Sequence, residues 1–171
     1  MPKLIKNRQI IDDAWVVVRD VAELEDIGRF DGQDLIVPLP WWLENRGSLI
    51  AQRQGRTGVW LDSHELPEAI REDLPLLEVV ALNFPVFSDG RPYSSARELR
   101  TVMGYQRELR AIGDVLRDQL FYMARCGFDA FAMREDQNLE FSLKAFDDFH
   151  EGYQSSVDRP LPLFRRRQQA S

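Results

Sequence analysis

The order of segments along the chain is the feature that most restricts its fold. Short runs rich in β-branched and apolar residues alternate with stretches whose apolar residues recur at helical spacing. Strands are predicted at residues 35–39, 58–61, 77–84, 109–112 and 128–133, and helices at 41–52, at 63–72, from Ser95, from Asp114 and at 142–150. This alternation is typical of βαβ units, so we expect an α/β fold with a mostly parallel sheet and flanking helices. Right-handed connections leave two arrangements open, a three-layer open sheet and a partial (β/α) barrel.

Local signals mark the expected helix ends. Ser63 is placed to cap one helix, Ser95 and Glu98 have the spacing of a capping box, and Asp114 precedes another helix. Gly127 follows that helix, at the position where a left-handed residue commonly ends one.

The length of 171 residues suits one domain, which we place at residues 1–154. Residues 10–11 and 14–18 predict a hairpin or an edge strand at its front. Residues 155–171, which contain Pro160, Pro162 and a basic cluster at 165–167, are expected to form a C-terminal tail that is either disordered or a docking element.

Composition removes several classes of function. Lys and Arg number 22 against 28 Asp and Glu, a net charge of −6, which argues against a nucleic-acid or anionic-membrane binder. Cys126 is the only cysteine, so the chain holds no internal disulfide, cysteine-ligated zinc or iron–sulfur cluster of its own. The start of the chain lacks an apolar signal core, and no run is long enough to span a membrane. We therefore expect a cytoplasmic protein.

The segment after the strand at 77–84 carries the richest candidate site. Ligands of parallel α/β sheets bind beyond the carboxyl ends of the strands, and this segment offers Asp89, Arg91, Tyr93 and Ser94 there. Residues 90–110 carry a net charge of +3, although the whole chain is acidic. The arginines of this stretch include Arg97, Arg100 and Arg110. The pattern predicts an anion-binding cleft, and the alternative is a structural turn with solvated arginines.

A second cluster follows the strand at 109–112. Asp114, Asp118 and Gln119 lie at the start of the predicted helix, where Asp114 is an ordinary helix cap. Asp118 is a candidate partner of Arg110 or Arg91 across the cleft, a structural role rather than a catalytic one.

Isolated reactive residues carry weaker signals. Cys126 sits at a helix end that disfavours a thiolate, which indicates a buried structural thiol. His64 is either a general base or a solvated loop residue, and no metal site is predicted. Dinucleotide, P-loop, hydrolase and zinc-protease motifs are absent, so the sequence names no cofactor and no catalytic residue.

The segments at 87–100, 108–119 and 125–129 resemble the bacterial domain-of-unknown-function family 934. The resemblance rests on the Asp-Gly-Arg turn at 89–91, followed at a set distance by Arg-Ala-Ile-Gly-Asp-Val-Leu-Arg-Asp-Gln at 110–119. Members of that family are described, from gene neighbourhood, as oxidoreductases involved in sulfite reduction, and no catalytic residue comes with the description.

The resemblance and the residues together suggest an accessory protein of assimilatory sulfite reduction. Such a protein binds an anionic ligand or a reductase partner, with sulfite reductase subunits as the partners that the resemblance implies. The alternatives are a cofactor-dependent oxidoreductase and a non-catalytic interaction module.

Overall fold

The computed structural model describes residues 2–147, so the predicted tail at 155–171 and the end of the last predicted helix lie outside it. Eight strands form one sheet, in the order β2-β1-β8-β7-β6-β5-β4-β3. The strands are β1 (Lys3–Lys6), β2 (Gln9–Asp12), β3 (Trp15–Val17), β4 (Asp34–Pro38), β5 (Thr57–Leu61), β6 (Val79–Phe84), β7 (Glu108–Gly113) and β8 (Ala130–Phe131).

The strands from β3 to β8 run parallel to their neighbours, and β1 joins β8 in the antiparallel sense. The front of the chain forms the hairpin β1–β2, while β3 is the opposite edge of the sheet. The segments predicted at 10–11 and 14–18 thus form β2 and β3, at opposite edges of the sheet, and the hairpin partner β1 at residues 3–6 was not predicted.

Helices connect the strands. The α-helices are α1 (Leu39–Gln52), α2 (Arg91–Arg97), α3 (Leu120–Cys126) and α4 (Leu139–Leu143). The tighter or wider turns are η1 (Val21–Leu24), η2 (Ile27–Phe30), η3 (Pro67–Leu76), η4 (Glu98–Val102, of the π type), η5 (Arg117–Gln119) and η6 (Lys144–Asp147).

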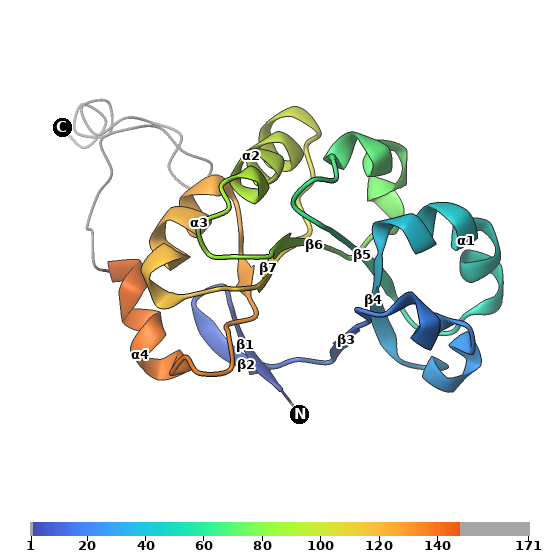
Figure 1. The fold of residues 1–171 in the computed structure, drawn as a ribbon, viewed down its shortest axis with the longest axis horizontal. Coiled ribbons are helices and arrows are strands. Elements are labelled where there is room, and N and C mark those ends of the chain that lie inside the picture. The colour runs from blue at the N-terminus through green and yellow to red at the C-terminus, as the bar shows by residue number, and fades with distance from the viewer. Residues whose placement is uncertain (1, 148–171) are drawn as a thin grey trace.

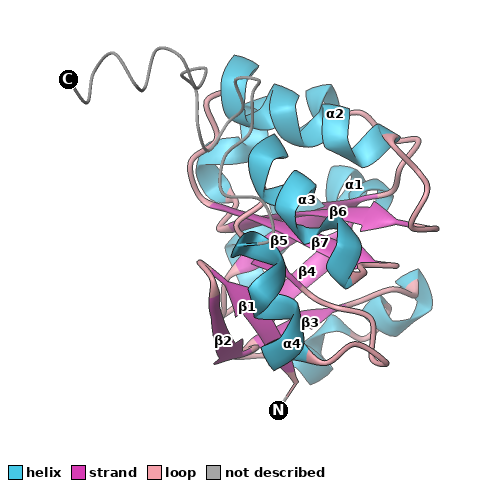
Figure 2. Ribbon diagram, turned by 90° about the vertical axis from the view of Figure 1, so that its left-hand side faces the viewer, coloured by secondary structure: helices cyan, strands magenta, loops and turns pink. Residues whose placement is uncertain are grey.

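The sheet is curled into a half-barrel with its helices on the outer side (Figure 1). The view turned by 90° shows the same layering, and α4 packs near the β1–β2 hairpin (Figure 2). The α/β prediction is confirmed, and of the two arrangements left open the structure has the partial barrel.

Two helix starts differ from the prediction. The helix expected from Ser63 begins instead at Pro67 as a 3-10 helix, and the Ser63 hydroxyl accepts a hydrogen bond from Arg91. The helix expected from Ser95 begins at Arg91, because Pro92 with its preset φ suits a first helical turn. Ser95 is thus buried inside α2 and caps nothing.

The third expected cap is also wrong. The helix predicted from Asp114 begins at Arg117 with the turn η5, and Asp114 accepts the backbone N–H of Phe87 from the neighbouring loop. Asp114 thus accepts a hydrogen bond from a residue 27 positions away and not from the start of its own helix. Gly127 does end α3 in the left-handed region, with φ 119°, as predicted.

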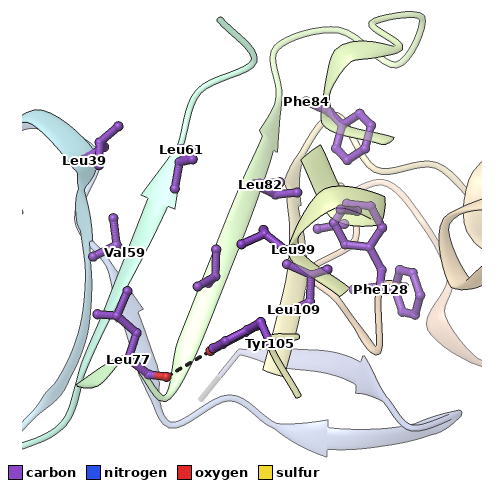
Figure 3. Close-up of a cluster of buried hydrophobic side chains, with 14 of the residues drawn as sticks. Leu39, Val59, Leu61, Leu77, Leu82, Phe84, Leu99, Tyr105, Leu109 and Phe128 are labelled. Carbon is purple, nitrogen blue, oxygen red and sulfur yellow. Dashed lines mark hydrogen bonds between the residues drawn. The ribbon is translucent and has the colours of Figure 1, made fainter. Parts of the chain in front are cut away.

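The main core lies between the sheet and the helices. Alternate residues of the strands point into it, such as Val59 and Leu61 from β5 and Leu82 and Phe84 from β6 (Figure 3). The Tyr105 hydroxyl, inside this core, donates to the Leu77 carbonyl at 3.0 Å, so its burial leaves no donor unpaired.

A smaller cluster covers the concave face of the sheet. It consists of Trp15, Ile36, Val79, Ala81 and Ile112, the residues that alternate with those of the main core. Both faces of the central strands are therefore buried, as in parallel sheets generally, and polar groups reach solvent mainly where the strands end.

Candidate functional site

The carboxyl ends of the parallel strands meet at one edge of the half-barrel and bring polar residues together there. We call this edge the C-terminal rim. It comprises Arg19 after β3, Asp62 and Ser63 after β5, Asn83 in β6, Asp89 and Arg91 after β6, Asp114 after β7, and Arg134 and Asp136 after β8. This edge is where ligands of parallel α/β folds and barrels bind.

Arg91 is held in place by two neighbours. Its Nε and Nη2 donate to the two carboxylate oxygens of Asp89 at 3.0 and 2.7 Å, and Nη2 also donates to the Ser63 hydroxyl at 2.8 Å. The guanidinium side chain is 62% exposed while that of Asp89 is 9% exposed. The bonds from Arg91 hold the pKa of Asp89 well below its usual range, so this carboxylate stays charged.

Arg19 occupies the other side of the same group. Its Nη1 donates to the Asn83 side-chain oxygen at 2.9 Å, and its guanidinium lies 5.1 Å from the centre of the Trp60 ring. Asn83 in turn donates to Asp62 at 3.0 Å, and the Ser63 N–H donates to the same oxygen at 2.8 Å. A continuous chain of hydrogen bonds therefore links the two arginines, and Arg19 meets a neutral amide where Arg91 meets a carboxylate.

Gly113 allows the rim to close tightly around Asn83. A Cβ at this position would lie 2.5 Å from the Asn83 side-chain oxygen and 2.4 Å from the Phe84 carbonyl, and its φ is 92°. Only glycine fits that approach without displacing the backbone.

Arg134 forms a second ion pair farther along the rim. It donates to Asp114 at 2.8 Å and to both oxygens of Asp136, whose pKa the pair lowers to about 2. Beside this pair lies a pocket of 430 Å³ lined in part by Asp118 and Asp136. The ion pair thus joins the loop after β8 to the loop after β7.

The rim presents guanidinium groups outward and keeps most of their carboxylates beneath them. Arg91 is 62% exposed over Asp89 at 9%, and Arg134 is 45% exposed over Asp114 at 19%. The carboxylates fix the orientation of the arginines, and an arriving ligand meets the cationic groups first.

The remaining residues predicted on α2 lie on its flank. Tyr93 is half-buried, with its ring 5.2 Å from that of Phe84 and 4.8 Å from that of Tyr122, and burial raises its pKa to about 12. Ser94 is exposed, and Arg97 stacks over the Tyr122 ring at 5.9 Å. These three side chains border the rim without joining its hydrogen-bond chain.

Arg100 and Arg110 do not share a cleft with Arg91. Arg100 donates to the carbonyls of Tyr105, Arg107 and Gly127, which ties the end of α2 and η4 to the neighbouring loops. Burial lowers its pKa.

Arg110 lies on the concave face of β7, 1% exposed, between the carboxylates of Glu108 at 2.8 Å and Asp13 at 2.9 Å. Lys6 pairs with Glu108 at 2.9 Å in the same group. Arg110 was predicted to share an anion-binding cleft with Arg91. Because these carboxylates hold Arg110 in the interior, that prediction is wrong.

The second predicted cluster is also divided. Asp118 is exposed beside the 430 Å³ pocket, and Arg110, one of its two expected partners, pairs elsewhere. Gln119 lies at the end of η5, with a buried side-chain oxygen that meets no donor within residues 2–147. Only Asp114 joins the rim.

Arg19, Asn83 and Arg134 are rim residues that were not predicted from the sequence. Each lies in or directly after a strand, so the rule on strand ends could have found them. Arg134 follows the predicted strand 128–133 directly, and Asn83 is the one polar residue late in the run at 79–84.

Reactive groups elsewhere are few in the described part of the chain. Cys126 is fully buried, as predicted for a structural thiol, and His64 is exposed on the loop after β5. Residues 2–147 contain no cluster of His, Cys, Asp and Glu able to hold a metal ion. Nor do they contain a helix long and apolar enough to cross a membrane.

Residues 58–164 match the model of a family described as bacterial protein of unknown function (DUF934). The chain belongs to the DUF934 family. The match covers the rim from β5 onward and leaves Arg19 outside, and the family description carries no activity. No curated protein and no solved structure matches the chain.

Proposed function

We propose that this DUF934 protein binds a small anionic ligand at the C-terminal rim, with Arg19 and Arg91 as its main contacts. One observation carries the proposal. Both guanidinium groups stand over the same hydrogen-bonded group of Asp62, Ser63 and Asn83, which holds them on one edge of the sheet.

Each arginine keeps donors for a ligand. The bonds to Asp89 and Ser63 use Nε and Nη2 of Arg91, and the bond to Asn83 uses Nη1 of Arg19. Guanidinium groups with fixed orientation bind oxyanions well, because little side-chain freedom remains to be lost. Arg19 bonds directly to a neutral amide, and the nearby Asp62 carboxylate offsets part of its charge.

Sulfite is the first anion to test, because the resemblance to family 934 associates such proteins with sulfite reduction. Sulfate and phosphate share its charge and size class, and flavin and nicotinamide nucleotides carry phosphates. In this proposal the protein is an accessory of the reduction, and the anion is its ligand or regulator.

Calorimetric titration measures the affinity of these anions for the wild-type protein and for Arg91→Ala and Arg19→Ala. Thermal shift measures how far each anion raises the melting temperature of the same proteins. We expect at least about tenfold weaker binding in each variant, since each loses a charge-assisted contact. Arg71→Ala is the matched control, because Arg71 is an exposed arginine in an ion pair with Glu68 outside the rim. Absence of binding at millimolar anion, or equal affinity in all variants, would refute the proposal.

A protein partner is the second candidate. Val86 and Phe87, in the loop that leads to Arg91, are 51% and 49% exposed, which is unusual for large apolar side chains beside a charged edge. A sulfite reductase subunit is the partner that the resemblance suggests. Capture of purified sulfite reductase by the wild-type protein and its loss in Phe87→Ser would support this function, with Phe141→Ser as an exposed aromatic control.

A catalytic role as an oxidoreductase would require a bound cofactor. The absorbance spectrum of the freshly purified protein distinguishes that role, because a flavin or a haem absorbs visible light. An absorbance band in the visible range that stays with the protein on gel filtration would show a bound cofactor. That result would favour an oxidoreductase over an accessory protein.

A further inference from the structure

A pocket of 540 Å³ lies between α1 and the turns η1 and η2, and it shares no lining residue with the rim. Its volume is in the range of sites that hold a ligand or a large side chain of a partner. Its apolar wall consists of Leu24, Ile27, Leu49 and the half-buried ring of Trp41. Arg53, the basic residue of the lining, already interacts with the charge of Asp31.

The surface around this pocket is acidic. Residues 20–31 carry five acidic side chains and one basic one, a net charge of −4. The basic residue, Arg29, pairs with Glu23. Glu25 in the lining and the adjacent Asp26 are exposed and form no ion pair within residues 2–147. The pocket therefore suits a ligand that combines large apolar groups with cationic groups.

The chain itself contains a segment of this chemistry. Residues 160–167 have the sequence Pro-Leu-Pro-Leu-Phe-Arg-Arg-Arg, in which Leu163 and Phe164 directly precede three arginines. The rim presents guanidinium groups outward and so repels this segment, whereas the acidic surface attracts it. The pocket lining ends at Arg53 and the family match covers residues 58–164, so the pocket and the three arginines both lie outside the matched region.

The length of the chain favours a second copy as the source of the segment. The described chain ends shortly after α4, which lies on the opposite side of the molecule from α1 (Figure 1). The chain between Asp147 and Phe164 spans at most about 60 Å when fully extended. A domain of this size is roughly 40 Å across, so the path over its surface to the far side is itself about 60 Å. The pocket of a second copy is therefore reached more easily.

We infer that residues 160–167 of one copy bind in this pocket of a second copy. Leu163 and Phe164 pack on the apolar wall beside Trp41, and the three arginines lie over Glu25 and Asp26. Exchange of the two segments about a twofold axis gives a closed dimer with two identical contacts. Each contact buries apolar side chains and pairs charges that otherwise meet only solvent.

The first experiment is sedimentation velocity on the whole chain between about 1 and 100 µM, which measures self-association. We expect a dimer whose fraction rises with concentration. The triple variant Arg165→Glu/Arg166→Glu/Arg167→Glu and the double variant Glu25→Lys/Asp26→Lys should each weaken self-association at least about tenfold, because like charges then meet.

A mixture of these two variants tests the contact itself. Each reversed surface then faces one of opposite charge, so dimerisation should return to within about tenfold of the wild type. A variant that had only lost stability would not recover on mixing. Glu72→Lys/Glu135→Lys is the matched control, since both acids are exposed outside the pocket and the change in net charge equals that of the double variant. It should dimerise as the wild type does.

The second experiment is photo-crosslinking from p-benzoylphenylalanine in place of Phe164, in a mixture of isotope-labelled and unlabelled chains. Mass spectrometry should find crosslinks between copies, to residues 24–53. A monomer at about 100 µM, no recovery on mixing, or crosslinks confined to other residues or to a single chain would each overturn the inference. Arg91→Ala should dimerise as the wild type does, so this result and the anion test at the rim are independent.

Discussion

Two arginines, one at the start of the helix that follows β6 and one within the neighbouring strand β7, have opposite surroundings. Arg91 follows β6 on the rim, with a side chain 62% exposed above its carboxylate. Arg110 lies within β7, 1% exposed, between two carboxylates on the concave face. Both are paired with acids, yet one is open to solvent and the other is enclosed.

The comparison shows that position along a parallel strand decides what an arginine can do. Within the strand, both faces of the sheet are covered. A charged side chain there is stable only when buried groups of opposite charge pair with it. Beyond the strand end the chain turns into solvent, and an ion pair there orients the arginine without enclosing it. The three predictions below test this difference, from the largest expected effect to the smallest.

Arg110→Met is expected to have the largest effect. Removal of the guanidinium leaves the carboxylates of Glu108 and Asp13 buried without their main partner, which costs about 3–5 kcal/mol in comparable cases. The free energy of unfolding, measured by urea denaturation, should fall by that amount. Arg91→Met is the matched control and should lower the unfolding midpoint much less, because Asp89 keeps the backbone N–H of residue 91 as a donor. Equal midpoints for the two variants would break the comparison.

Arg100→Ala is expected to have an intermediate effect. Its guanidinium donates to the backbone carbonyls of Tyr105, Arg107 and Gly127, in the loops after η4 and α3, and the loss of this charged donor costs about 2 kcal/mol. Urea denaturation measures the loss, and anion titration on the same variant should show wild-type affinity. A weaker affinity for the anion would return Arg100 to the binding site and contradict its assignment as a structural residue.

Asp89→Asn is expected to have the smallest effect on stability, because its pair with Arg91 is exposed to solvent on the arginine side. The folded-state pKa of Asp89 is lowered, so its contribution is present above the ordinary pKa of about 4 and is lost as the pH falls below it. Urea denaturation at neutral pH and near pH 3 should therefore show a smaller acid loss in Asp89→Asn than in the wild type. An unchanged acid loss would show that the pair stabilises nothing.

Much of the fold could be predicted, because its signals are local. The runs at 35–39, 58–61 and 77–84 form β4, β5 and β6 at nearly the expected ends, since buried parallel strands are continuous apolar runs. Gly127 ends its helix as predicted. Caps were less predictable, because Ser63 and Asp114 found partners in other loops, and a distant donor leaves no mark in the local sequence.

The candidate site was predictable only in part. The rule on strand ends selected Asp89, Arg91 and Asp114 correctly for one edge of the sheet. It could not separate them from Arg97, Arg100 and Arg110, which share their charge and their stretch of sequence. That separation depends on the face of the strand and the length of the helix, which give neighbouring arginines different partners.

The sequence by itself determined the succession of strands and helices, the burial of Cys126 and the absence of disulfide or cysteine-cluster chemistry. These follow from local periodicity and from residue counts. The tertiary structure alone decided the curl of the sheet and the surroundings of each arginine. Asp13 meets Arg110 across 97 positions of chain, and the association of segments so far apart depends on the packing of the whole sheet.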